Sequence, residues 1–215
     1  MKDALKFMKI DYTMSKSQNK IFLLFIVVAF VLAINSNNPL FVSVYLTFGA
    51  LVLSSAPFSL ESYYNMAFVN LLPSSIRSRI TGRFMFASLY LLVSLVCAEV
   101  SSILMMGKEL TVEIRTLFFF PLFMIGVALV FITIQYVLLY AIGIGKKQQY
   151  MRLVCMLPGF ILFGISSSLS EEVQGKIFAP SFLNYSILLT FTFGIVFMLI
   201  GRELTIKIVS RRDSI

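Results

Sequence analysis

The chain has 215 residues, of which 59% are hydrophobic and only 13% are charged, and its formal net charge is +8. Soluble domains are roughly 45–50% apolar and about 25% charged, so this composition excludes an ordinary soluble protein and predicts an integral membrane protein. The sequence contains no histidine, the commonest general base and a common metal ligand, which argues against a membrane-embedded enzyme.

The first twenty residues are polar and basic, with five lysines. Ala4, Leu5, Met8 and Tyr12 recur at helical spacing, which leaves the lysines largely on other faces. This pattern is typical of an amphipathic helix that lies in the lipid headgroup layer. A disordered basic tail is the alternative interpretation.

Six apolar stretches follow and predict an all-α membrane protein with six transmembrane helices. The predicted spans cover about 21–34, 40–58, 84–105, 117–144, 153–169 and 182–200. The first run also resembles the apolar core of a secretory signal, but the spans that follow it favour a membrane span. The whole chain, 1–215, is then one transmembrane domain. Its parts are an interfacial helix (1–20), spans one and two (21–58), a polar segment (59–83), spans three to six (84–200) and a tail (201–215).

Basic residues fall mainly on one side of this topology. Fifteen of the 18 lysines and arginines lie in the two termini, the 59–83 segment and the loop around 145–152, whereas the alternate loops hold three. Lysine and arginine accumulate in cytoplasmic loops, so we expect both termini and the 59–83 segment to be cytoplasmic.

The segment Ser59–Arg83 is the long polar interruption between spans two and three. Ser59 is suited to cap a helix, and Glu61 favours the positive end of that helix. Apolar residues then follow at steps of about four, at Leu60, Tyr64, Phe68, Leu71 and Leu72. The spacing predicts a short amphipathic helix parallel to the membrane, with an apolar face that needs a partner groove.

A break is expected at Leu72-Pro73, because proline disfavours helix at the residue before it and suits a new helix start. Three arginines precede the third span: Arg77, Arg79 and Arg83. We therefore expect a second helix that rises from Pro73 into the bilayer.

Two polar residues within the predicted spans are candidates for a cargo pathway. Glu99 lies in the third span, about 22 Å along the helix from Phe84, and Gln135 lies in the fourth. Ionisable residues at membrane depth are costly and usually functional, although Glu99 can also reach water near the outer interface. Gln135 is better suited to an interhelical hydrogen bond. The 22 phenylalanines and 11 methionines suit an apolar or amphipathic cargo, or simply lipid-facing packing.

The segment most similar to a nucleotide-binding loop is Gly143-Ile-Gly-Lys-Lys147, and it does not match the pattern. The pattern needs a glycine where this chain has Tyr140, and serine or threonine where it has Lys147. We therefore expect no catalytic site and no bound cofactor or metal on this chain, and any ATP-driven activity would need a separate polypeptide.

The chain resembles the permease subunits of type-2 ABC exporters, in particular a compact bacterial group that includes phenol-soluble modulin and antimicrobial peptide exporters. The resemblance rests on Leu72-Pro73-Ser74-Ser75-Ile76-Arg77 followed by Gly82-Arg83, together with the six-span layout. The family often has a Ser-Arg pair where this chain has Ser75-Ile76.

The resemblance implies a partner ATPase subunit that binds ATP and Mg, a second permease subunit, and location in the bacterial cytoplasmic membrane. The ATPase-coupling residues would be Glu61, Tyr64, Phe68, Leu71, Leu72, Pro73 and Arg77. The expected activity is export of an apolar or amphipathic cargo, such as a peptide toxin or antimicrobial peptide, and nucleic acid is not an expected partner. The alternative from a different class is a stand-alone secondary transporter or membrane assembly factor.

Overall fold

The computed structural model describes residues 2–35, 39–64, 75–105, 114–143 and 180–212, with single positions at 157 and 164. The described residues are helical almost throughout, which confirms the all-α prediction. The helices are α1 (Lys2–Met14), α2 (Lys16–Asn35), α3 (Pro39–Ser54), α4 (Ala56–Tyr64), α6 (Ile76–Met105), α7 (Ile114–Ile142) and α10 (Pro180–Arg212).

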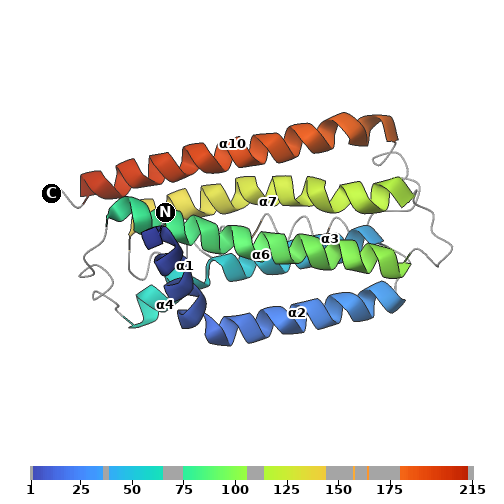
Figure 1. Ribbon diagram of the computed structural model, residues 1–215, viewed down its shortest axis with the longest axis horizontal. Helices are drawn as coiled ribbons and strands as arrows, with labels where there is room; N and C mark the ends of the chain where they lie inside the picture. Colours follow the sequence, from blue (N-terminus) through green and yellow to red (C-terminus); the bar gives the residue numbers. More distant parts are fainter. Residues whose placement is uncertain are drawn as a thin grey trace.

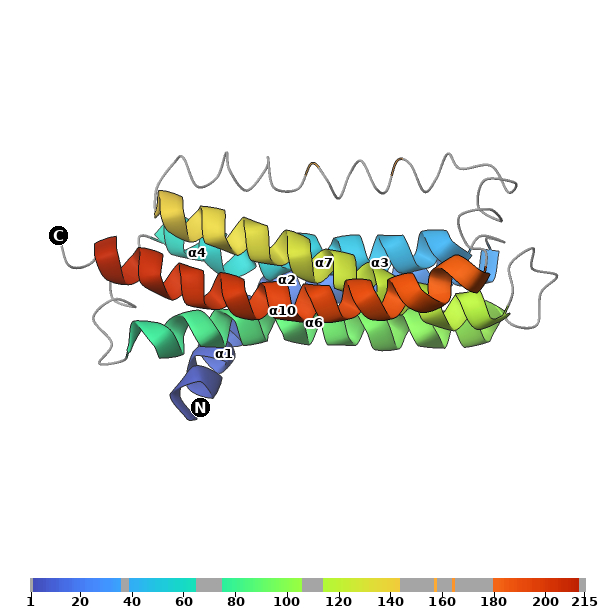
Figure 2. The same ribbon diagram turned by 90° about the horizontal axis from the view of Figure 1, so that it is seen from above.

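The long helices α2, α3, α6, α7 and α10 run side by side along the longest dimension of the molecule (Figure 1). The short helix α1 crosses the bundle at one end, where α4 and both chain termini also lie. Seen from above, α1 projects to one side of the bundle (Figure 2). We call this end of the molecule the α1 end.

Five helices among the described residues are long and apolar enough to cross a membrane. They cover Lys16–Asn35, Phe41–Glu61, Ile76–Met105, Phe118–Ile142 and Ser186–Arg212. These correspond to predicted spans one, two, three, four and six. The predicted fifth span, about 153–169, falls almost entirely outside the described residues, so the total of six spans stays a prediction.

The first span begins earlier than expected. The sequence placed its start at Ile21, but α2 already begins at Lys16, and a turn at Ser15 separates it from α1. The polar residues from Lys16 to Lys20 therefore belong to the same helix as the apolar run and add a turn at its N-terminal end. Such an extension is favourable because the apolar run by itself is short for the roughly 20 residues that a bilayer requires.

The boundary of α4 also differs from expectation. The helix begins at Ala56, not at Ser59, and the Ser59 hydroxyl donates a hydrogen bond of 2.8 Å to the Ala56 carbonyl inside the helix. Ser59 is therefore not the N-cap. Pro57 is tolerated here because the first turn of a helix has no use for its missing N–H.

Helices α7 and α10 pack through glycines. A Cβ atom built on Gly194 of α10 would lie 2.6 Å from the carbonyl oxygen of Gly126 on α7. At the α1 end, α7 stops at Gly143, whose φ of 77° is the left-handed conformation that commonly ends helices. Arg212 of α10 donates a hydrogen bond of 3.3 Å to the Tyr140 carbonyl in that last turn, so the two helix ends are joined.

Candidate functional site

The buried guanidinium of Arg83 is the centre of the candidate site at the α1 end. Arg83 is only 3% exposed and lies near the start of α6. Its Nη1 and Nη2 donate to the two carboxylate oxygens of Glu61 in α4, at 2.9 and 2.6 Å. Its Nε and Nη2 donate to the two oxygens of Asp11 in α1, at 3.3 and 3.2 Å. One side chain therefore links three helices, and we call Asp11, Glu61 and Arg83 the charge triad.

Two aromatic rings enclose the same guanidinium. Its Cζ lies 4.6 Å from the ring centroid of Phe58 and 5.8 Å from that of Tyr140. The planar guanidinium suits this arrangement, because its edges bind two carboxylates bidentately while its faces contact π systems. Lysine could not reproduce these contacts, since its ammonium is a single point charge.

The charge triad has a net negative formal charge. One guanidinium faces two carboxylates, and all three side chains are less than 10% exposed. Burial raises the pKa of the Asp11 carboxyl above its usual range, and the attraction of Arg83 acts against that rise. Removing Arg83 alone would leave two carboxylates buried close together, which is far more costly than the intact network.

A glycine allows α1 to reach the triad. A Cβ on Gly82 of α6 would lie 2.6 Å from both the Ala4 carbonyl oxygen and the Phe7 Cβ of α1. The buried face of α1 consists of Ala4, Phe7 and Asp11, so it rests on α6 at Gly82 and places Asp11 beside Arg83. Of the residues expected to share the apolar face, Ala4 is buried here, whereas Leu5 and Tyr12 are 45% and 50% exposed. The position of α1 in the headgroup layer stays a prediction.

Tyr136 of α7 contacts the junction between α3 and α4. The Phe58 amide donates to the Ser55 carbonyl at 3.2 Å, which leaves the Ser54 carbonyl at the end of α3 without its regular helical donor. The Tyr136 hydroxyl donates to that carbonyl at 2.6 Å. The ring of Tyr136 also meets Phe58 and Phe84 edge to face, with centroids 5.0 and 5.1 Å away.

We expect Tyr136→Phe to lower the free energy of unfolding by about 1–3 kcal/mol, because it leaves the buried Ser54 carbonyl unpaired while keeping the ring contacts. Thermal unfolding of the purified protein in detergent measures the loss. Tyr12→Phe is the matched control, since Tyr12 is 50% exposed. An equal change in both variants would contradict the role assigned to the buried hydroxyl.

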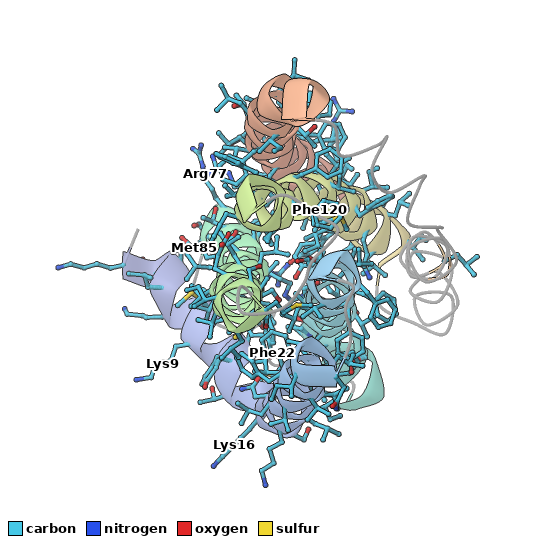
Figure 3. The ribbon with its side chains drawn as sticks, turned by 90° about the vertical axis from the view of Figure 1, so that its right-hand side faces the viewer. Lys9, Lys16, Phe22, Arg77, Met85 and Phe120 are labelled. Carbon is cyan, nitrogen blue, oxygen red and sulfur yellow. The ribbon has the colours of Figure 1, made fainter. Side chains whose placement is uncertain are left out.

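The structure describes few of the residues expected to couple to an ATPase. Glu61 is 7% exposed and its carboxylate binds Arg83, so it faces the interior. Arg77 lies at the outside of the bundle (Figure 3) and its Nη2 binds Glu203 of α10 at 3.1 Å. The side chain of Tyr64 and all of Phe68, Leu71, Leu72 and Pro73 lie outside the described residues.

The two candidate cargo-pathway residues are not brought together. Gln135 is 1% exposed and adjoins Tyr136, which contacts Phe84, whereas Glu99 is half-buried about 22 Å farther along α6. Neither side-chain polar atom of Gln135 has a hydrogen-bond partner among the described residues, so the expected interhelical bond is not formed there. The described residues also hold no cluster of side chains suited to a metal ion.

The triad is not predicted by the sequence. Arg83 precedes the third span with two other arginines, and Asp11 belongs to no motif. The available signal is an acidic residue at position 11, four residues after Phe7 and seven after Ala4, on the buried face of α1. An acidic residue on the packed face of a helix requires a cationic partner.

The long apolar helices and the basic end with its buried charge triad define a multi-pass α-helical membrane protein. Within that class, the chain belongs to the ABC-2 family transporter proteins, whose family model matches residues 7–210. It is therefore the transmembrane subunit of an ABC transporter and works with an ABC ATPase. Comparisons with curated proteins and with solved structures each gave no significant match.

Proposed function

We propose that this chain is the permease of an exporter that moves an apolar or amphipathic peptide across the bacterial cytoplasmic membrane. Its ATPase partner would bind at the α1 end, on the segment that follows α4. ATP and Mg would be bound by that partner. Two copies of this chain, or one copy and a similar permease, would pair with two ATPase subunits.

The observation that carries the proposal is the junction at Arg83. The expected coupling segment starts in α4, and α4 is tied to α6 through the Glu61–Arg83 contact. A push on the segment after α4 would therefore reach a membrane-spanning helix through two charge-assisted hydrogen bonds, which are shorter and stronger than neutral ones. Asp11 extends the same connection to α1.

The basic residues support a cytoplasmic position for the α1 end. All five lysines of α1 and early α2 are exposed. Lys207, Arg211 and Arg212 of α10 lie at that end as well. This clustering follows the bias of lysine and arginine toward cytoplasmic segments. An ATPase partner is accessible only from that side.

The cargo class rests on the composition of the spans. Phenylalanine and methionine, with 22 and 11 residues, provide aromatic and flexible apolar surfaces that adapt to varied apolar ligands. Gln135 adds an unpartnered buried amide within α7, among the described residues. A path with a few polar groups among many apolar ones suits a peptide with one apolar face.

We expect Phe68→Asp or Leu72→Asp to abolish copurification with a co-expressed ABC ATPase partner, because each places a charge on the apolar face that is to enter a partner groove. Co-expression followed by affinity purification and an ATP-turnover assay measures both binding and coupling. Because each variant would bury one unpaired charge, its affinity for the ATPase should fall by at least about tenfold.

Ser75→Asp is the matched control for these variants. It adds the same charge to the same segment, but Ser75 is exposed and its hydroxyl caps α6 by accepting a 3.2 Å hydrogen bond from the Ser78 amide. Aspartate serves equally well as an N-cap. Normal ATPase binding by both Phe68→Asp and Leu72→Asp would exclude the segment as the docking site, whereas transport without any ATPase would contradict the exporter proposal.

A further inference from the structure

A cavity of about 200 Å³ opens between α1, α2 and α6, and none of the triad residues lines it. Tyr12, Asn19 and Tyr90 form its polar lining, and Leu23, Ile26 and Val93 contribute to its apolar lining. Most of its exposed wall is apolar. The cavity is open to the outside of the bundle, where a membrane protein meets lipid.

The lining changes in polarity along α2. Asn19 accepts a hydrogen bond from the Tyr90 hydroxyl, and its amide donates to the Tyr12 carbonyl at 3.2 Å. Ile26 lies seven residues farther along the helix, about 10 Å deeper toward the centre of the bundle. The polar groups thus lie at the α1 end and the apolar groups deeper, which is the order of headgroup and acyl chain within one leaflet.

Three exposed lysines lie about one helical turn from residues that line the cavity. Lys9, Lys16 and Lys20 each lie three residues before a lining residue, namely Tyr12, Asn19 and Leu23. Residues three apart are neighbours on a helix surface, so each lysine lies on the same side of its helix as a residue that lines the cavity. Figure 3 shows Lys9 and Lys16 extended away from the bundle, whereas Phe22 points into it.

The two acidic residues of α1 are paired elsewhere and do not neutralise these lysines. Asp3 binds Lys6 at 3.0 Å, and Asp11 is buried against Arg83. The cavity mouth is therefore positively charged, above an apolar interior at membrane depth. Charge and polarity together match a molecule with an anionic head and a hydrocarbon tail.

We propose that this cavity is a binding site for an anionic phospholipid. Part of one acyl chain fills the space beside Ile26 and Val93, and the phosphate head binds Lys9, Lys16 and Lys20. The site would select anionic over zwitterionic lipids, because each basic residue near the surface adds attraction for anionic headgroups. The lipid would also hold α1 against the bundle next to the charge triad.

The chain contains no tryptophan, so a single introduced tryptophan reports on one position. Leu23→Trp places the reporter in the cavity wall, and Leu24→Trp is the matched control. The two leucines are 61% and 62% exposed at the same depth, but only Leu23 lines the cavity. Each variant is reconstituted into phosphatidylcholine nanodiscs that contain brominated-chain phosphatidylglycerol or brominated-chain phosphatidylcholine.

We expect brominated phosphatidylglycerol to quench Leu23→Trp more strongly than brominated phosphatidylcholine does, with a much smaller difference at Leu24→Trp. In the Leu23→Trp background, the preference should fall about fivefold for each lysine replaced by glutamine at positions 9, 16 and 20. Val93→Phe should reduce quenching by both lipids, because the larger ring fills the cavity.

Equal lipid preference at the two reporters would overturn the proposal, since it would reflect only general attraction of anionic lipid to the surface. A preference that survives the triple lysine replacement would overturn it as well. If an added amphipathic peptide, and neither lipid, changes the Leu23→Trp fluorescence, the cavity binds cargo and the lipid proposal is wrong. Size-exclusion profiles confirm that each variant is folded.

Discussion

Arg83→Met is expected to lower the free energy of unfolding by about 3–5 kcal/mol, the largest single effect that we predict. The variant keeps the volume of the side chain but leaves the carboxylates of Asp11 and Glu61 buried without a cation. Their mutual repulsion adds to the desolvation cost. Thermal unfolding in detergent, followed by size-exclusion chromatography, measures the loss.

A compensating variant separates this charge effect from simple loss of packing. Replacing all three triad residues, as Arg83→Met with Asp11→Leu and Glu61→Met, removes the unpaired charges together with their partner. Apolar replacement of an entire buried ion network is often neutral or stabilising. We therefore expect the triple variant to recover most of the stability that Arg83→Met loses.

The exposed ion pair between Arg77 and Glu203 provides the control for Arg83→Met. The side chain of Arg77 is 67% exposed, and that of Glu203 is 44% exposed. Exposed ion pairs contribute about 0–1 kcal/mol, so Arg77→Met should change stability little. If Arg77→Met and Arg83→Met were equally destabilising, burial would not be the reason for the loss.

The triple variant also tests the proposed route from α4 to α6. If the triad transmits motion from the ATPase, a folded protein without it should bind the ATPase but show weaker cargo-stimulated ATP turnover. If the triad only stabilises the fold, ATP turnover should recover together with stability. The two readouts therefore distinguish a transmitting role from a structural one.

The membrane-spanning helices were predictable because each carries its own signal. An apolar run long enough to cross a bilayer is a local property of the sequence, so α3, α6, α7 and α10 were expected near their observed positions. Boundaries were less predictable. The starts of α2 at Lys16 and of α4 at Ala56 depend on flanking turns that hydropathy does not describe.

The charge triad was not predictable because its members are distant in sequence. Arg83 lies 72 residues from Asp11 and 22 from Glu61. Taken singly, Arg83 is one of three arginines before the third span and Glu61 favours the positive end of a helix, whereas Asp11 belongs to no motif. The packing of α1 across α6 at Gly82 brings Asp11 to Arg83, and that crossing has no periodic signal in the sequence. Glu61 reaches the same guanidinium from α4.

Gly194→Leu is expected to destabilise the bundle by separating α7 from α10. A Cβ at this position would lie 2.6 Å from the Gly126 carbonyl oxygen and 3.1 Å from the Leu129 Cβ. The first of these contacts is with backbone, which cannot rotate away as a side chain can. Close approach of helices at small residues is a main source of association between membrane helices.

Even Gly194→Ala should be destabilising, although alanine is favoured over glycine within a helix by about 1 kcal/mol. Overpacking typically costs about 1–3 kcal/mol, which exceeds that gain when the neighbouring atoms are backbone. Gly164→Ala is the control, because a Cβ there meets no atom of the described residues within 4 Å. Thermal unfolding of the three variants should rank Gly164→Ala highest and Gly194→Leu lowest.

Gly126 and Gly194 contact each other, so a double variant tests whether both act through the same interface. A Cβ on Gly126 would lie 2.8 Å from the Thr190 backbone, so Gly126→Ala alone should also push the helices apart. Once one alanine has separated α7 from α10, the second meets less resistance. The stability loss of the double variant should therefore be smaller than the sum of the two single losses, because contacting sites are not additive. Additive losses would show that each glycine acts through its own helix and not through the shared interface.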